Sequence, residues 1–352
     1  MAREWMKNVR QVEPYVPGEQ PRTLEVTKLN TNENPYPPAP GVRKVLAEVT
    51  DDALRRYPDP ECRVLRQALA DYHGVTLDEV FVGVGSDDVL AMAFMTFFHG
   101  EKPVLFPDIT YAFNPVWANL LGIPFATCPL GEDYRIRKED YFQGNGGIVI
   151  PNPNAPTSLW EPLQTIEEIA AANPGSVVIV DEAYIDFGGE SALPLIRRYD
   201  NLLVTRTFSK SRSLAGMRIG YALGSPELIA AMNSVKFSYN SYTLNAAALA
   251  AGVASLQDEA YFRETITKIK DTRDAAVERL TGLGFTVLTP SANFVYAAHG
   301  TWEARDLFRA LREAGIIVRY FDKPRIHQFL RITIGKPEEM EKLYHFLENY
   351  QG

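Results

Sequence analysis

From about Asp78 onward the chain alternates short, wholly apolar runs with longer segments of helical character. The apolar runs are EVFVGVG, KPVLFP, GGIVIPN, SVVIVDEAY, NLLVTRTFSK and MRIGYAL. Strands that are apolar throughout are typical of a sheet buried on both faces, and alternation with helices is typical of parallel strands. The pattern therefore predicts an α/β fold with a mostly parallel central sheet covered by helices.

The two ends of the chain have different patterns. The first forty-odd residues are rich in Pro, Asn and Glu, which predicts an extended arm with turns. A long helical stretch is expected over roughly residues 243–280, followed by GFTVL, NFVYAA, a helix near residues 302–314, IIVRYF, FLRITIG and a final helix. We therefore predict a large domain over residues 45–255, and a smaller α/β domain in which residues 256–352 pack with the arm, residues 1–44.

Composition narrows the class of protein. Of the 352 residues 46% are hydrophobic and 23% are charged, as in ordinary globular chains. The net charge of -8, with no basic run, argues against a nucleic-acid partner. The sequence has neither a signal-peptide pattern nor an apolar run of about 18 residues, so no membrane partner is expected. Cys62 and Cys128 have no disulfide-framework or metal-site spacing, and the five histidines are scattered. We expect a cytoplasmic protein without a metal.

Candidate chemistry follows from the residues at the predicted strand ends, because parallel α/β sheets bind ligands there. EVFVGVG is followed by Ser86, Asp87 and Asp88 at the start of a helical run. A glycine-flanked helix N-terminus can bind an anion, although an ordinary helix cap would have the same sequence. The dinucleotide pattern GxGxxG is incomplete, since Asp88 occupies the place of its last glycine.

Two later strand ends, those of the fourth and fifth apolar runs, carry a carboxylate and a lysine. Asp181 ends SVVIVD, where a buried carboxylate needs a cationic partner such as a pyridinium nitrogen, unless it merely caps a helix. Lys210 follows NLLVTRTFS, close to the phosphate-type donors Thr207, Ser209 and Arg218. A partly desolvated lysine is a usable amine nucleophile. Together these features supply what pyridoxal 5'-phosphate (PLP) requires: an anion site, a counter-carboxylate and a lysine.

At this point the chain resembles the fold-type I PLP-dependent aminotransferases, and among them the histidinol-phosphate aminotransferases. The similarity extends over nearly the whole chain through VRQVEPYVPGEQP, KLNTNENPYPP, GVGSDDVL, PDITYAF, PNPNAPT, VDEAYIDF, RTFSKSRSLAGMRIGY and FLRITIG. The pair DEAY and SK…LAGMRIGY is specific for the PLP fold. The arm VEPYVPGE with LNTNENP is typical of the histidinol-phosphate branch.

The resemblance implies roles for individual residues. Lys210 holds the cofactor covalently and, once released, moves the substrate proton. Asp181 pairs with the protonated pyridine nitrogen and Tyr184 donates to the ring oxygen O3'. The remaining cofactor contacts that it implies are Tyr111 on the ring face, and Ser86, Asp87, Thr207, Ser209, Arg218 and the partner subunit's Tyr57 at the phosphate. Tyr15, Asn32, Arg319 and Arg331 would bind the substrate.

One segment departs from the family. The usual pattern is NPxNPTG, with an asparagine before the second proline that donates to O3'. Here the segment reads NPNAPTS, so Ala155 stands in that place and Ser158 replaces the glycine. Either Asn154 makes the contact or O3' is left to Tyr184, and we favour Asn154.

The resemblance implies a homodimer with shared active sites that transfers an amino group from histidinol phosphate to 2-oxoglutarate, giving imidazole-acetol phosphate and glutamate. The partners are then a small-molecule amino donor and a 2-oxo acid acceptor. An aromatic or broad-specificity aminotransferase, or a threonine-phosphate decarboxylase of the same fold, would share every cofactor residue. A more distant alternative is a non-catalytic relic of the fold, although a relic has no need of Lys210, Asp181 and Arg218 together.

Overall fold

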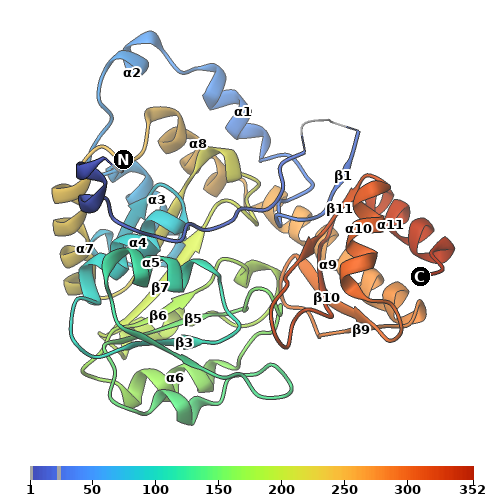
Figure 1. Ribbon diagram of the computed structural model, residues 1–352. Helices are drawn as coiled ribbons and strands as arrows, with labels where there is room; N and C mark the ends of the chain where they lie inside the picture. The colour runs from blue at the N-terminus through green and yellow to red at the C-terminus, as the bar shows by residue number, and fades with distance from the viewer. Residues whose placement is uncertain (1–2, 22–24) are drawn as a thin grey trace.

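The computed structural model describes residues 3–21 and 25–352. They form a larger part built around a seven-stranded sheet and a smaller part built around a four-stranded sheet (Figure 1). The large sheet has the strand order β2-β8-β7-β6-β5-β3-β4. Its strands are β2 (Val80–Gly83), β3 (Val104–Pro107), β4 (Phe125–Cys128), β5 (Gly147–Pro151), β6 (Val178–Asp181), β7 (Leu202–Thr207) and β8 (Gly220–Leu223). Strand β8 is antiparallel to both β2 and β7, and the other neighbouring pairs are parallel. The prediction of a mostly parallel sheet is confirmed.

Each of the six apolar runs contains a strand of this sheet, whereas β4 was not predicted. Strand β4 lies at the edge of the sheet, and Ala126 and Thr127 are exposed. An edge strand with exposed positions needs no continuous apolar run, so its pattern is weak.

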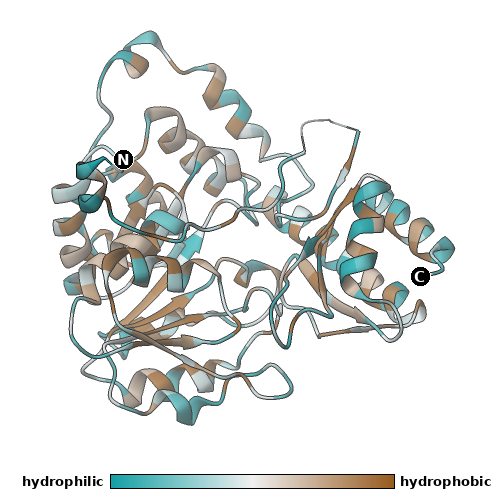
Figure 2. Ribbon diagram, viewed as in Figure 1, coloured by the Kyte–Doolittle hydropathy of each residue, from teal (hydrophilic) through white to brown (hydrophobic). Residues whose placement is uncertain are grey.

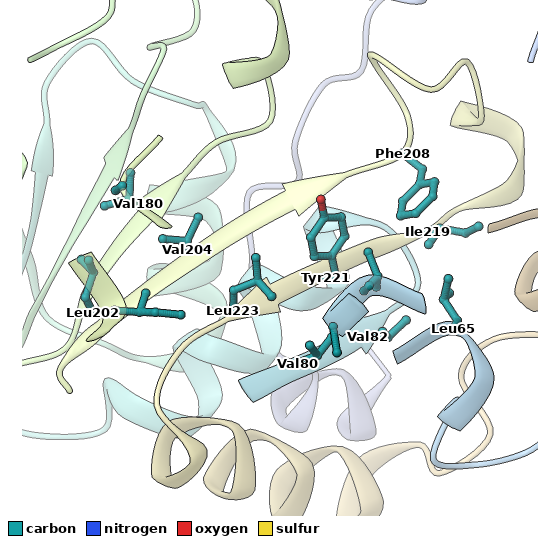
Figure 3. Packing of buried hydrophobic residues seen from close by; sticks show 14 of the residues in the cluster. Leu65, Val80, Val82, Val180, Leu202, Val204, Phe208, Ile219, Tyr221 and Leu223 are labelled. Atoms are coloured by element: carbon teal, nitrogen blue, oxygen red, sulfur yellow. The ribbon is translucent and has the colours of Figure 1, made fainter. Parts of the chain in front are cut away.

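Both faces of the large sheet are buried because alternate residues point to opposite sides. Val178, Val180, Leu202 and Val204 belong to one core cluster, shown with its neighbours in Figure 3. Ile179, Leu203, Phe81 and Phe106 belong to a second cluster, which packs against α4 and α5. Figure 2 shows the same arrangement, with mostly hydrophobic strands and hydrophilic outer surfaces on the helices. The continuous apolar runs are thus explained by burial on both sides.

The helices of the larger part lie on both faces of the sheet and above one end of it (Figure 1). They are α1 (Pro40–Ala47), α2 (Asp51–Arg55), α3 (Arg63–His73), α4 (Ser86–Phe97), α5 (Phe113–Leu121), α6 (Leu163–Ala172), α7 (Pro226–Tyr239) and α8 (Ala246–Gln257). No helix of residues 3–21 and 25–352 is long and apolar enough to span a membrane.

The smaller part has an antiparallel sheet of order β12-β13-β10-β9. Its strands are β9 (Phe285–Val287), β10 (Phe294–His299), β12 (Arg319–Tyr320) and β13 (Leu330–Thr333), and its helices are α9 (Glu259–Gly282), α10 (Ala304–Glu313) and α11 (Pro337–Asn349). The arm joins it because β1 (Thr27–Lys28) pairs in parallel with β11 (Ile316–Ile317). Residues 3–21 of the arm run across the larger part as the dark blue trace in Figure 1.

The single helix expected over residues 243–280 is in fact two helices. Helix α8 ends at Gln257 and α9 begins at Glu259. Asp258 separates them with non-helical dihedral angles, and its side chain accepts a hydrogen bond from the Tyr261 N–H. An aspartate that caps the second helix in this way competes with the continuous helix. The domain division at residue 255 stays a proposal, and this break lies close to it.

Candidate active site

A cavity of about 450 Å³ lies where the ends of β5 and β6, the loop after β7, the arm and the small sheet meet. Most of the predicted site residues line it: Tyr15, Asn32, Ser86, Asp87, Tyr111, Asp181, Tyr184, Ser209, Lys210, Arg218, Arg319 and Arg331. Asn154, Thr207 and Tyr57 do not line it. Parallel topology explains the convergence, because strand ends that are distant in sequence meet at one edge of the sheet.

Lys210 presents its amine at this cavity directly after β7. Its Nζ donates to the Thr31 carbonyl oxygen at 3.0 Å and lies 5.8 Å from the centre of the Tyr184 ring. Within the part of the chain that the structure describes, no carboxylate forms a salt bridge with Lys210, and the nearby Glu33 is paired with Lys28. The amine is therefore held by a single backbone oxygen and is available for chemistry.

Asp181 is a buried carboxylate with hydrogen bonds but no cation. Only 7% of the residue is exposed, and its Oδ1 accepts from Thr205 Oγ1 at 3.2 Å and from the Ala183 N–H at 3.3 Å. Among residues 3–21 and 25–352 no basic side chain forms a salt bridge with it. Burial raises the pKa of Asp181 to about 7. A protonated pyridine nitrogen would be the missing cation, so this residue fits PLP.

An anion site lies where α4 begins beside β8. A Cβ on Gly220 would lie 2.3 Å from the Ser86 nitrogen, and a Cβ on Gly85 would lie 2.5 Å from Arg218 Nη2. Only glycine permits this close approach of the guanidinium to a helix N-terminus, which favours anions. Arg218 donates to the Ala215 carbonyl oxygen at 3.2 Å, and its contacts with side chains are long, at 3.4 Å to Ser209 Oγ and 3.4 Å to Asp87 Oδ2. The cluster therefore has room and charge for a phosphate.

Two tyrosine hydroxyls and an asparagine amide also line the cavity and are held by hydrogen bonds. The Tyr111 hydroxyl donates to Asp87 Oδ1 at 2.7 Å, and burial raises the pKa of Tyr111. The Tyr184 hydroxyl accepts from Asn32 Nδ2 at 2.9 Å. Asn32 is fixed in turn by Thr333, which donates to its Oδ1 and accepts from its N–H. Tyr184, the predicted O3' donor, is thus oriented by the arm.

Two arginines from the small sheet form a second cationic region. Arg319 and Arg331 are directly paired across β12 and β13, and no carboxylate in the described ranges forms a salt bridge with either. Arg331 donates to the Asn30 carbonyl at 2.7 Å, while its buried Nε has no partner. Burial lowers the pKa of Arg331, because a cation without an anion is costly there.

Arg319 is shared between the cavity and the arm. Its two terminal nitrogens donate to the carbonyl oxygens of Val16 at 3.1 Å and Pro17 at 3.3 Å. Tyr15, also on the arm, lines the cavity and stacks on Phe113 with ring centres 4.2 Å apart. The arm therefore closes the cavity at the side where the two guanidinium groups lie.

Comparison with known proteins agrees with this geometry. The model of the aminotransferase class I and II family matches residues 25–347. The chain belongs to the class I and II aminotransferases. It is 53% identical to the histidinol-phosphate aminotransferase of Pseudomonas putida over 97% of this chain and 99% of that one. The corresponding enzyme of Acinetobacter baumannii is 52% identical over 98% and 97%.

Solved structures show the same fold for this aminotransferase. The histidinol-phosphate aminotransferase of Sinorhizobium meliloti, in complex with pyridoxal-5'-phosphate, superimposes with a TM-score of 0.84 at 26% identity and covers 91% of this chain and 90% of that one. The prediction of a fold-type I, PLP-dependent aminotransferase is confirmed. Membership of this family also excludes a dinucleotide-dependent enzyme, in agreement with the incomplete GxGxxG pattern.

The structure does not bring Asn154 into the aminotransferase cavity, contrary to our preference. Its Nδ2 donates to the Ile109 carbonyl and to Thr157 Oγ1, both at 3.0 Å. The side chain is therefore used to hold neighbouring loops, and Ala155 faces the cavity in its place. Of the two alternatives for O3', this arrangement favours Tyr184 alone.

Thr207 and Tyr57 also lie outside the cavity of this single chain. Thr207 Oγ1 accepts from the Ser209 N–H at 3.1 Å and donates to the Ile219 carbonyl, so it shapes the phosphate loop from beneath. Tyr57 is 81% exposed and stacks on Tyr242. Its predicted contact with a neighbouring subunit stays a prediction.

Several residues at the aminotransferase cavity were not singled out from the sequence. Asn30, Thr31 and Glu33 line it beside Asn32, and Thr205 contacts Asp181 from β7. The motif LNTNENP could have signalled the first group, since it was recognised as a unit. Thr205 has a weaker signal, because Arg206 and Thr207 in the same strand are also polar and only the register with Asp181 distinguishes it.

The buried charge of Asp181 predicts a pH-dependent stability of the cofactor-free protein. The folded-state pKa of about 7 lies above the usual value of 3.8, so the folded state binds more protons and stability falls as pH rises through that window. Asp181→Asn removes this loss and should gain stability relative to wild type, about 4 kcal/mol above pH ~7 and close to none below pH ~4. Thermal unfolding of both apo proteins across this range measures it. A stability difference that does not change with pH would contradict the assignment.

Proposed function

We propose that this aminotransferase transfers the amino group of histidinol phosphate to 2-oxoglutarate, producing imidazole-acetol phosphate and glutamate. The observation that carries the proposal is the pair of cationic regions in one cavity. Arg218 with the α4 N-terminus lies at one side, and Arg319 with Arg331 lies at the other. One region suits the cofactor phosphate, which leaves the second for an anionic substrate.

A second cationic region, with no carboxylate partner among the described residues, matches both proposed substrates. Histidinol phosphate carries a phosphate remote from its amine, and 2-oxoglutarate carries a remote carboxylate. The planar guanidinium fork binds either group through two hydrogen bonds. The names of the relatives at 52–53% identity support the choice of histidinol phosphate.

The residues of the chain then have separate tasks. When bound, PLP supplies the electron sink that makes the substrate Cα–H acidic. Asp181 holds a positive charge at the pyridine nitrogen, Tyr184 donates to the ring oxygen, and Arg218 and Ser209 hold the phosphate. Lys210 Nζ takes the proton from the substrate Cα, since it is the free amine at the cavity. Arg331 orients the substrate through its remote anion.

We also propose a homodimer in which each cavity receives Tyr57 from the partner. Support comes from Tyr57 itself, which is exposed and stacks on the partly exposed ring of Tyr242, and from other exposed apolar side chains close to these two in the sequence, Leu54, Val64 and Tyr239. Burial of exposed apolar side chains favours association. The cytoplasmic location expected from the sequence stays a prediction.

A half-reaction assay tests the substrate. Histidinol phosphate, phenylalanine, tyrosine and aspartate are added separately to the purified holoenzyme, and conversion of the cofactor to its amine form is followed by absorbance. Histidinol phosphate should react fastest. Faster reaction of phenylalanine or tyrosine would indicate an aromatic aminotransferase, and release of carbon dioxide from threonine phosphate would indicate a decarboxylase.

Replacing the lysine should abolish transamination. Lys210→Ala removes both the amine that holds the cofactor and the proton carrier, so kcat should fall by several orders of magnitude. Lys44→Ala, at an exposed position of α1, is the matched control and should leave kcat unchanged. If Lys210→Ala keeps more than about a tenth of the wild-type kcat, the assignment is wrong.

Replacing Arg331 should separate substrate binding from cofactor binding. Arg331→Lys keeps a positive charge but loses the fork, so KM for histidinol phosphate and for 2-oxoglutarate should rise about tenfold or more. Cofactor content should not change. Arg309→Lys, exposed on α10, controls for the substitution. Unchanged KM values for both substrates would make Arg331 a structural residue.

Shared active sites predict complementation between two inactive or impaired variants. Lys210→Ala and Tyr57→Ala are co-expressed, and the mixed dimers are assayed. If Tyr57 acts on the partner's cavity, one cavity of each mixed dimer has both residues intact, and activity rises above that of either variant alone. If Tyr57 serves its own chain, each cavity lacks one residue. No rise would then appear, and the proposal of shared sites would fail.

A further inference from the structure

We propose that Thr205 is the positioning residue for Asp181: its hydroxyl sets the rotation of the carboxylate so that Oδ2 faces the cavity. Thr205 is fully buried in the middle of β7, and its Oγ1 donates to Asp181 Oδ1 at 3.2 Å. It does not line the cavity. The inference rests on the PLP chemistry of the proposed function and is independent of which amino donor the enzyme uses.

Strand register explains why this residue reaches Asp181. In the parallel β6·β7 pair Thr205 is the Cα partner of Asp181, and both side chains continue the row of Ile179 and Leu203. Directly neighbouring positions on one face of a sheet bring side chains into contact. The contact is thus a consequence of register and not of a flexible loop.

A buried ion pair holds that register. Glu182 and Arg206, the next residues along the two strands, form a salt bridge of 2.8 Å with side-chain exposures of 0% and 11%. Their side chains follow Val180 and Val204 on the opposite face. A slip of one residue would separate this pair, which is strongly unfavourable for buried charges. Thr205 is therefore held opposite Asp181.

The two oxygens of Asp181 are used differently. Oδ1 receives both hydrogen bonds, from Thr205 and from the Ala183 N–H. Oδ2 receives none from the described residues, and it is not among their buried polar atoms without a partner. Since Asp181 is exposed only where it lines the cavity, Oδ2 is the oxygen open to a ligand. Loss of the hydroxyl would remove one of two bonds that fix this orientation.

The hydroxyl also favours the ionised form that a pyridinium nitrogen needs. Burial raises the pKa of Asp181, the charges of Asp87 and Glu182 raise it further, and the bonds from Thr205 and Ala183 lower it. Lys210, Arg218, Arg319 and Arg331 are the cations on the same cavity, and among the described residues none of them forms a salt bridge with Asp181. Among the described residues, Thr205 is therefore the side chain whose hydrogen bond lowers this pKa.

The test measures PLP binding and not turnover, so it does not depend on the substrate proposal. Cofactor-free wild type, Thr205→Val and Thr205→Ser are titrated with PLP at a series of pH values, and the visible absorbance of the bound cofactor is followed. Valine has the shape of threonine without the hydroxyl. We expect Thr205→Val to bind PLP about tenfold more weakly. We also expect its PLP affinity to fall at a higher pH than in wild type as the solution is made more acidic, because loss of the hydroxyl favours the protonated form of Asp181.

Two further variants separate positioning from packing. Thr265→Val removes another buried hydroxyl, which bonds only to its own helix α9, and should bind PLP as wild type does. Thr205→Ala removes the hydroxyl without added bulk and should match Thr205→Val, which covers the case in which valine disturbs folding. Thr205→Ser should recover most of the affinity. Wild-type affinity and pH dependence in both Thr205→Val and Thr205→Ala, or equal impairment of the serine and valine variants, would overturn the proposal.

Discussion

A carboxylate that the protein desolvates without supplying a counter-ion is the interaction on which the active site depends. Asp181 lies at the end of a strand that is buried on both faces, so its charge has little access to water. Residues 3–21 and 25–352 give it two hydrogen bonds and no salt bridge with a cation. The cost of that charge is recovered only when a positive ligand atom arrives, which makes the free site energetically complementary to a protonated pyridine ring.

The same principle operates with the opposite sign at the far side of the cavity. Arg319 and Arg331 are neighbours across two strands and repel each other, yet the described residues offer them only backbone oxygens and aromatic faces. The cavity thus lacks a positive charge beside Asp181 and a negative charge beside Arg319 and Arg331. It therefore favours a cofactor that brings the positive charge together with a substrate that brings the negative one. Geometry then decides which amine is brought to Lys210.

Sequence patterns predicted the buried strands and the chemically distinctive residues at their ends, because both leave a signal in a short stretch of sequence. The six apolar runs predicted six of the seven strands of the large sheet. Asp181 and Lys210, which end or follow two of these strands, meet at the cavity as expected. Edge strand β4 was missed because exposure removes its apolar pattern. The structure places Asn154 outside the cavity, since its amide donates to nearby Thr157 and to the carbonyl oxygen of Ile109, a contact between distant segments that no local pattern encodes. Thr205 was overlooked for a related reason, since its role depends on the register of two strands.

The reversed direction of β8 has a consequence for how such enzymes can diverge. Because β8 runs antiparallel to β7, it starts at the edge where β6 and β7 end, and Arg218 lies two residues before its first residue, Gly220. Asp181, Lys210 and Arg218 therefore come from one uninterrupted stretch of chain, whereas Tyr15, Arg319 and Arg331 come from the arm and the small sheet. Selection can change the second group without disturbing the first. A lineage can thus acquire new amino donors while it inherits its cofactor chemistry intact.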